Sequence, residues 1–130
     1  YKIGSGNFIG IPLQTSKDIA EDLILTKELG IDMAAFSPFL PTKLIALKKK
    51  ETPSLNKCLN VISVARILMK NIQIISPFSL DHLSENGRSK GLEAGANVVM
   101  QSCTPEKHDS QLFIPPGFQT FKPHARNSLN

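Results

Sequence analysis

The sequence predicts an α/β fold built from about four parallel β/α units. Short apolar runs alternate with amphipathic segments of helical period, and loops that contain proline or glycine close the runs. Strands joined by helices pair in parallel through right-handed crossovers. At 130 residues the chain has the length of one ordinary domain, and also about half of the ~250 residues of a closed (β/α)₈ barrel. Both an open doubly wound sheet and half of a barrel therefore fit the pattern.

The first unit is expected over residues 7–30. Residues 7–11 are a short apolar run that stops at Pro12, which predicts a buried strand. Ser16 is the expected N-cap of the helix that follows, and Gly30 ends it. The glycine-rich stretch 4–10 precedes a strand, whereas a phosphate-binding loop follows one, so we interpret this stretch as a turn.

The second unit begins with a buried strand at residues 33–36. The segment Ser-Pro-Phe-Leu-Pro at 37–41 breaks this strand. Apolar residues then recur at helical intervals, which predicts a helix over residues 55–69.

The third and fourth units are shorter. Residues 72–75 form a β-branched run, and a weak helix over 81–94 is interrupted by Gly87 and Gly91. A fourth strand is expected at 96–100, after which the periodicity fades. We therefore predict a partial β/α barrel or sheet over residues 1–105 and an irregular tail over residues 106–130.

The composition excludes several classes of protein. Apolar residues are 41% and charged residues 20% of the chain, which excludes full disorder. The net charge of +4 is mild, and the basic residues are not interleaved with aromatic ones, so nucleic acid is not an expected partner. No apolar run approaches the ~18 residues of a membrane span, and no signal segment opens the chain, so we expect no membrane partner and a cytoplasmic location. The start at Tyr1 without a methionine is what an excised or truncated piece would have.

The two cysteines predict no metal site. Cys58 and Cys103 lie far apart in the sequence, without the CxxC or Cys/His spacing of a zinc or redox motif. Cys58 lies on the apolar face of a predicted helix, which indicates a core position. Cys103 has His108 nearby, yet nothing else marks a Cys/His catalytic pair.

Candidate binding residues follow the predicted strands. In open sheets and in barrels alike, ligands bind at the carboxyl ends of the strands. Gln14 and Thr15 lie there, and their side chains either bind a ligand or cap the next helix. Residues 37–41 either wall a flat ligand or form a stiff exit from the strand.

Four segments in this order resemble the carboxyl-terminal half of biotin-synthase-like radical S-adenosylmethionine (radical SAM) enzymes, most closely the [FeFe]-hydrogenase maturase branch. They are Phe-Ile-Gly-Ile-Pro-Leu-Gln-Thr at 8–15, Ser-Pro-Phe-Leu-Pro at 37–41, Val-Ala-Arg-Ile-Leu-Met at 64–69, and Gly-Ala-Asn-Val-Val-Met at 95–100 followed by Thr104-Pro105. The resemblance implies that this chain supplies the second half of a (β/α)₈ TIM-type barrel.

The family implies two cofactors for a complete enzyme. Its members bind a [4Fe-4S] cluster through a CxxxCxxC loop in the first half of the barrel, and S-adenosylmethionine is cleaved there to a radical. This chain lacks that loop, and two distant cysteines cannot replace three closely spaced thiolates. We therefore expect a fragment or divergent copy that contributes SAM- and substrate-facing loops and is inactive alone, with no cofactor bound by this chain alone.

The implied partners follow from the missing half. They are an amino-terminal half-barrel or a second copy, and a small-molecule substrate in a complete enzyme. The alternative is a non-catalytic half-barrel that self-associates or binds a partner, because such a half leaves sheet edges uncovered.

Carried over position by position, the resemblance implies two sets of site residues. The cofactor-binding set is Gly10, Pro12, Pro38, Phe39, Pro41 and Asn97, and the substrate-binding set is Gln14, Thr15, Met100, Thr104 and Pro105. Pro38 and Phe39 would wall the adenosyl group. The sequence departs from the family pattern at Leu13, where the family has glycine, and at Ser37 and Thr42, where it has glycine and histidine.

Overall fold

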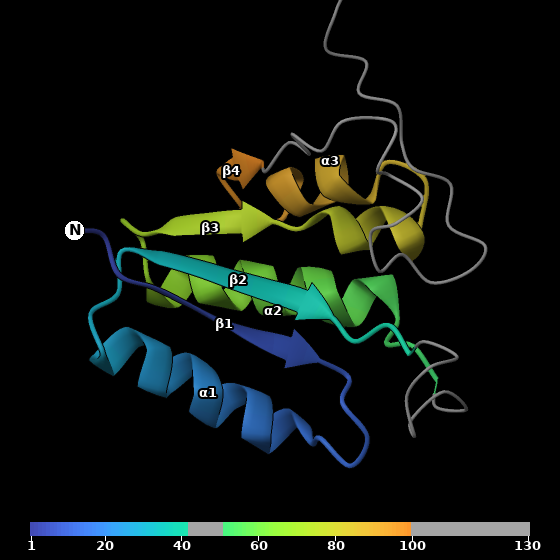
Figure 1. The fold of residues 1–130 in the computed structure, drawn as a ribbon, viewed down its shortest axis with the longest axis horizontal. Helices are drawn as coiled ribbons and strands as arrows, with labels where there is room; N and C mark the ends of the chain where they lie inside the picture. Colours follow the sequence, from blue (N-terminus) through green and yellow to red (C-terminus); the bar gives the residue numbers. More distant parts are fainter. Residues whose placement is uncertain (42–50, 100–130) are drawn as a thin grey trace, which may run out of the picture.

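The computed structural model describes residues 1–41 and 51–99. Four strands form one parallel sheet in the order β1-β2-β3-β4, and each of the first three is followed by helical structure before the next strand (Figure 1). This confirms the predicted α/β fold with parallel units. The predicted tail at 106–130 and residues Met100, Cys103, Thr104 and Pro105 lie outside the described residues.

Strand β1 spans Gly4–Ile9 and pairs with β2, Met33–Pro38. The interpretation of the glycine-rich stretch as a turn is therefore wrong, because Gly4 and Gly6 belong to β1. Gly6 allows the two strands to pair closely, since a Cβ at this position would lie 2.6 Å from the carbonyl oxygen of Ala35.

Helix α1 spans Ser16–Glu28, and its N-cap is Thr15 rather than Ser16. The Thr15 hydroxyl accepts a hydrogen bond from the Asp18 backbone N–H, and the Asp18 carboxylate accepts one from the Thr15 backbone N–H. This reciprocal pair is a capping box, which occupies backbone donors that the first turn of a helix leaves free. Helix α2 spans Leu55–Leu68 and is capped by the hydroxyl of Ser54.

The third unit differs from its prediction. Strand β3 spans Gln73–Ser76, and a 3₁₀ turn, η1 (Phe78–His82), precedes the short helix α3 (Gly87–Glu93). The expected single weak helix is thus two pieces. Gly87 and Gly91 bring α3 close to its neighbours. A Cβ on Gly87 would overlap the Leu80 carbonyl oxygen, and a Cβ on Gly91 would overlap the Ser76 hydroxyl. Strand β4 is described as Val98–Val99.

The helices cover one face of the sheet. Sequential parallel strands with right-handed crossovers place every connecting helix on the same side. The side chains of β2 accordingly alternate, with Ala34, Phe36 and Pro38 buried and the residues between them half-buried. Phe36 and Ile74 pack with Ile19 and Leu23 of α1 and with a group of α2 residues, namely Cys58, Val61, Ile62 and Ala65.

On β1 and β2 the opposite face of the sheet carries four small residues, Gly4, Gly6, Ala35 and Ser37, beside the larger Met33 and Phe8. In the register of the two strands, Gly4 is opposite Met33, Gly6 is opposite Ala35, and Phe8 is opposite Ser37. The three β1 residues of this set are exposed. The barrel interior of a typical (β/α)₈ fold is filled by bulky branched side chains. Ile75, in register with Ala35, is of that kind and is buried, whereas Gly6 and Ala35 leave room beside it.

The capping box predicts a pH dependence of stability. Hydrogen bonds from the Thr15 backbone N–H and hydroxyl lower the pKa of Asp18 below 3.8. A carboxylate with a depressed pKa stabilises the fold above the pKa of the unfolded chain, and this contribution is lost as the pH falls through the folded-state value. We expect Asp18→Asn to be less stable than the parent near pH 6 and the difference to shrink below about pH 4. Urea unfolding across this range measures it, and a difference that does not change with pH would contradict the role of the charge.

Candidate functional site

The loops that follow β1, β2 and β3 meet at the carboxyl edge of the sheet, where the arrowheads of these strands lie in Figure 1. Residues 10–15 connect β1 to α1, and residues 39–41 follow β2. The Phe39 backbone N–H donates a hydrogen bond of 2.8 Å to the Ile9 carbonyl, which joins the two loops at their base. The structure therefore brings Gly10, Pro12, Phe39 and Pro41 to one edge.

The loop after β1 contains a tight turn at Ile11–Gln14. The Gln14 N–H donates to the Ile11 carbonyl at 2.9 Å, Pro12 is the second residue, and Leu13 is the third, with a φ of 72°. Pro at the second position and a positive φ at the third identify a type II turn. Glycine is the residue that adopts this φ without strain, and the resembled family has glycine here. Leu13 makes almost no contact within the described residues, since it is 96% exposed.

Gly10 holds this loop against the segment before α2. Its φ is 85°, and a Cβ at this position would lie 2.7 Å from the Cβ of Pro53. Both the backbone conformation and the contact with Pro53 require glycine. The loop after β1 is thereby packed beside the N-terminus of α2.

Gln14 and Thr15 are engaged in hydrogen bonds within the chain. The Gln14 side-chain oxygen accepts from the Gly10 N–H at 2.7 Å, and its amide nitrogen donates to the Phe8 carbonyl at 2.9 Å. Thr15 caps α1, as described above. Of the two interpretations that the sequence left open, the structure shows the capping one for Thr15, and it shows a loop-closing role for Gln14. Substrate contact by either residue stays a prediction.

The exit from β2 separates Pro38 from its neighbours. The Pro38 side chain is fully buried on the helix-covered face, whereas Phe39 and Pro41 are half-buried. The adenosyl wall is predicted from Pro38 and Phe39, and of these two only Phe39 has exposed surface at this edge, so its contact with a nucleoside stays a prediction. The corresponding role of Pro38 stays a prediction, and its buried ring sets the direction of the strand exit.

Asn97 does not lie with these residues. It immediately precedes β4, where its side-chain oxygen accepts from the Ile74 N–H at 2.7 Å and its own N–H donates to the Ile74 carbonyl at 2.9 Å. Ile74 pairs with Ala34, which pairs with Ser5 near the start of β1. Asn97 therefore joins β4 to β3 nearer the amino ends of the strands.

Sequence reasoning missed the polar contacts that support the loop after β3. The Asp81 carboxylate bonds to the backbone N–H and the guanidinium of Arg88, and the buried Ser76 hydroxyl donates to the Arg88 carbonyl at 2.8 Å. Phe78 and His82 form an edge-to-face ring pair, and burial lowers the pKa of His82. Asp81 lies seven positions from Arg88 and Ser76 lies twelve positions from it. No local motif in the sequence signals contacts at these separations.

The described residues do not fit an iron–sulfur cluster. No group of three His, Cys, Asp or Glu side chains gathers among residues 1–41 and 51–99. Cys58 is fully buried within α2, and burial raises the pKa of its thiol to about 11. A cluster ligand is a thiolate, so a protonated thiol packed in the core cannot serve.

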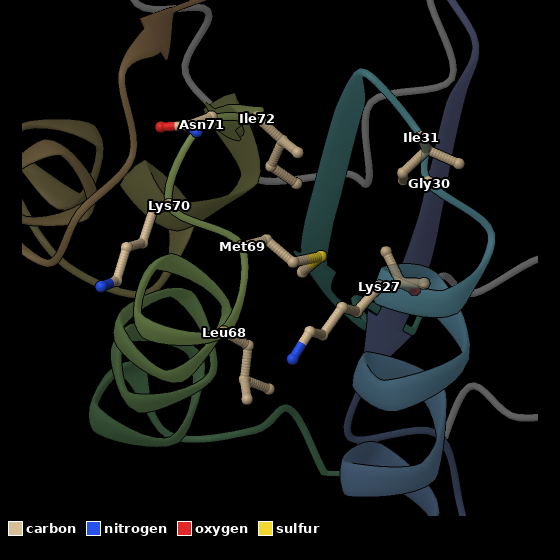
Figure 2. Close-up of a pocket in the computed structure, with 9 residues that line it drawn as sticks. Lys27, Gly30, Ile31, Leu68, Met69, Lys70, Asn71 and Ile72 are labelled. Carbon is tan, nitrogen blue, oxygen red and sulfur yellow. The ribbon is translucent and has the colours of Figure 1, made fainter.

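A shallow groove of about 240 Å³ lies at the other end of the fold, between the last turns of α1 and α2 (Figure 2). Lys27 reaches across it towards Leu68 and Met69. It is remote from the carboxyl-edge loops and contains none of the predicted site residues. Within the described part of the chain, no helix is long and apolar enough to span a membrane.

The chain is similar to a known hydrogenase maturase. Over 117 residues, 90% of this chain, it is 30% identical to the [FeFe] hydrogenase maturase subunit HydE of Thermotoga maritima. The matched region is 34% of that protein, so the chain spans about a third of the length of this relative. No protein-family model matches the chain. The similarity supports a relationship to radical SAM enzymes, as the sequence motifs indicate.

The turn at Leu13 predicts a stabilising substitution. A non-glycine residue in the left-handed region costs roughly 1–2 kcal/mol, and the added flexibility of glycine costs about 0.5–1 kcal/mol, so Leu13→Gly should stabilise the chain by about 0.5–1 kcal/mol. Leu13→Ala keeps the strained φ and serves as the control, with no gain expected. Urea unfolding of both variants measures the effect, and an equal gain from alanine would contradict the turn assignment.

Proposed function

We propose that the chain is a fragment or divergent copy of a radical SAM enzyme of the biotin-synthase and hydrogenase-maturase kind, and that it contributes SAM- and substrate-facing loops. One observation carries the proposal. The match to HydE covers nearly all of this chain and a third of that protein, and the matching chain folds as sequential parallel β/α units. In the proposal these units are the second half of a (β/α)₈ barrel.

The open face of the sheet supports a ligand-holding interior. In a closed barrel the face opposite the helices lies inside. Gly6, Ala35 and Ser37 on this face have small side chains, whereas a packed barrel carries branched ones such as the neighbouring Ile75. Together with Gly4 they would leave room inside for a small molecule.

The loops at the carboxyl edge supply contacts suited to a nucleoside. Phe39 and Pro41 offer half-buried apolar surfaces at the edge where the Gly10 loop also lies, and Pro53 fills the place that a Gly10 side chain would take. Gln14 and Thr15 hold the loop in shape through the hydrogen bonds described above. We therefore assign adenosine contact to Phe39 and Pro41, and loop support to Gln14 and Thr15.

The chain does not carry the radical-generating step in this proposal. S-adenosylmethionine cleavage would require a [4Fe-4S] cluster, and the described residues do not fit one. The residues of this chain bind and orient the nucleoside and exclude water beside it. Cluster ligands would come from a separate part of a complete enzyme.

A non-catalytic half-barrel is the second candidate. It is favoured by apolar side chains left exposed on the described surface, among them Phe8 at 57%, Leu25 at 54% and Leu29 at 62%. Contiguous exposed apolar residues mark a surface that another chain or segment covers, and Leu25 and Leu29 are one helical turn apart. In this reading the fold serves association alone, and the carboxyl-edge loops bind no nucleoside.

A chimera distinguishes the two candidates. The matched region of Thermotoga maritima HydE is replaced by this chain, and after anaerobic reconstitution with iron and sulfide the formation of 5′-deoxyadenosine is measured beside intact HydE. We expect the chimera to cleave S-adenosylmethionine and the 130-residue chain alone to show neither cleavage nor iron-dependent visible absorption.

Two variants of the chimera locate the contact. Phe39→Ala should weaken S-adenosylmethionine binding roughly two- to tenfold, because a stacked aromatic ring contributes roughly 0.5–1.5 kcal/mol. Phe78→Ala is the matched control, since Phe78 is an exposed aromatic residue of the neighbouring loop to which no nucleoside contact is assigned. A chimera that incorporates the cluster but neither binds nor cleaves S-adenosylmethionine would overturn the proposal.

A further inference from the structure

Strand β1 is an outer strand of the sheet, and among the described residues it pairs with β2 alone (Figure 1). The carbonyls of Ile3 and Ile9 accept hydrogen bonds from Met33 and Phe39, on the β2 side. Backbone groups of a strand alternate in direction, so the peptide N–H and C=O of Gly4, Gly6 and Phe8 point to the free edge.

Gln14 closes this edge at its carboxyl end. Its side-chain amide bonds to the Phe8 carbonyl and to the Gly10 N–H. These are the two groups that one residue of a parallel neighbouring strand would bind, since a parallel partner bridges the residues before and after the one it faces. The amide therefore takes the place of the last residue of a parallel neighbour. Within the part of the chain that the structure describes, the outward-facing backbone groups of Gly4 and Gly6 have no partner strand.

The same side of the unit carries an uncovered apolar stripe on α1. Lys27 shares the groove of Figure 2 with Leu68 and Met69 and so marks the flank of α1 that faces α2. At about 100° per residue, Leu25 and Leu29 fall on the opposite flank, one turn apart. Both are more than half exposed.

We propose that the free edge of β1 and the Leu25–Leu29 flank of α1 together dock a further β/α unit. Its strand pairs in parallel with residues 4–8, and its helix packs on Leu25 and Leu29. The chain already shows this arrangement one unit further on, where β2 pairs with β1 and α2 packs against α1. The occupant is a segment of the kind that makes up the rest of HydE, because the match leaves about two-thirds of that protein outside it. The inference rests on the proposed function and specifies its partner.

Co-purification with a defined probe tests the docking site. The 130-residue chain is co-expressed with the portion of Thermotoga maritima HydE that lies outside the matched region, and light scattering after size exclusion gives the stoichiometry. We expect a one-to-one complex. Replacing both leucines, Leu25→Glu with Leu29→Glu, should weaken it about 100-fold or more, because two buried charges would replace apolar contacts.

A matched control lies on the same helix. Ile24 is 51% exposed, close to the value for Leu25, but it lies about 100° away around the helix. Ile24→Glu should leave the affinity within about threefold of the parent, which is the scale of a surface charge effect. Circular dichroism of all variants reports whether α1 is retained.

Three results would overturn the docking site. They are the absence of a complex, a complex that the double variant binds as tightly as the parent, and a homodimer of the chain that the double variant dissociates, which would assign the surface to a second copy. The chimera described above links the two parts covalently, so it tests the loops independently. An active chimera without docking would refute this inference alone, and docking with an inactive chimera would refute the proposed function alone.

Discussion

Parallel pairing of strands in sequential order is the constraint on which the rest of this structure depends. Crossovers between sequential parallel strands share one hand as a rule, which places their helices on one face of the sheet. That face holds the buried core around Phe36, Ile62 and Ile74. The other face and the outer edge of β1 receive no helix of their own among the described residues. The open face, the free edge and the bare flank of α1 are therefore consequences of one topology.

The loop after β1 shows how local conformation serves this topology. Gly10 turns the chain beside Pro53, the type II turn at Pro12 and Leu13 reverses it, and the Gln14 amide returns to bond with β1. Thr15 then starts α1 through its capping box. The six residues from Gly10 to Thr15 thus end a strand, close part of its edge and begin a helix. The same loop lies at the edge where ligands of parallel β/α folds bind.

Much of the fold could be predicted because periodicity and helix signals are local. The strand at Met33 and the helices that begin at Ser16 and Leu55 follow from apolar spacing and capping residues. The strand character of Gly4 and Gly6 was missed because glycine is a poor strand former in isolation. A glycine at position 6 is favoured in this strand because Ala35 approaches its backbone closely.

The candidate site was less predictable than the fold, because its residues are defined by contacts between distant segments. Pro38 follows the strand period into the core, although its motif places it beside Phe39 in the loop. Asn97, just before β4, bonds to Ile74 of the adjacent strand β3, and no spacing within the sequence signals that contact. Gln14 could be placed in the correct loop, but its bonding to the edge of β1 depends on the alternation of backbone groups in the folded strand.

Site-resolved amide hydrogen exchange of the isolated chain tests the central claim most directly. If β1 is a free parallel edge closed by Gln14, the amides of Gly4, Gly6 and Phe8 exchange close to the rate of an unfolded chain. The amides of Ser5 and Asn7, which face β2, and of Gly10, which bonds to Gln14, should exchange at least about tenfold more slowly. Adding the portion of HydE that lies outside the matched region should then slow the exchange of the Gly4, Gly6 and Phe8 amides. Strong protection of these three amides in the isolated, monomeric chain would contradict the account.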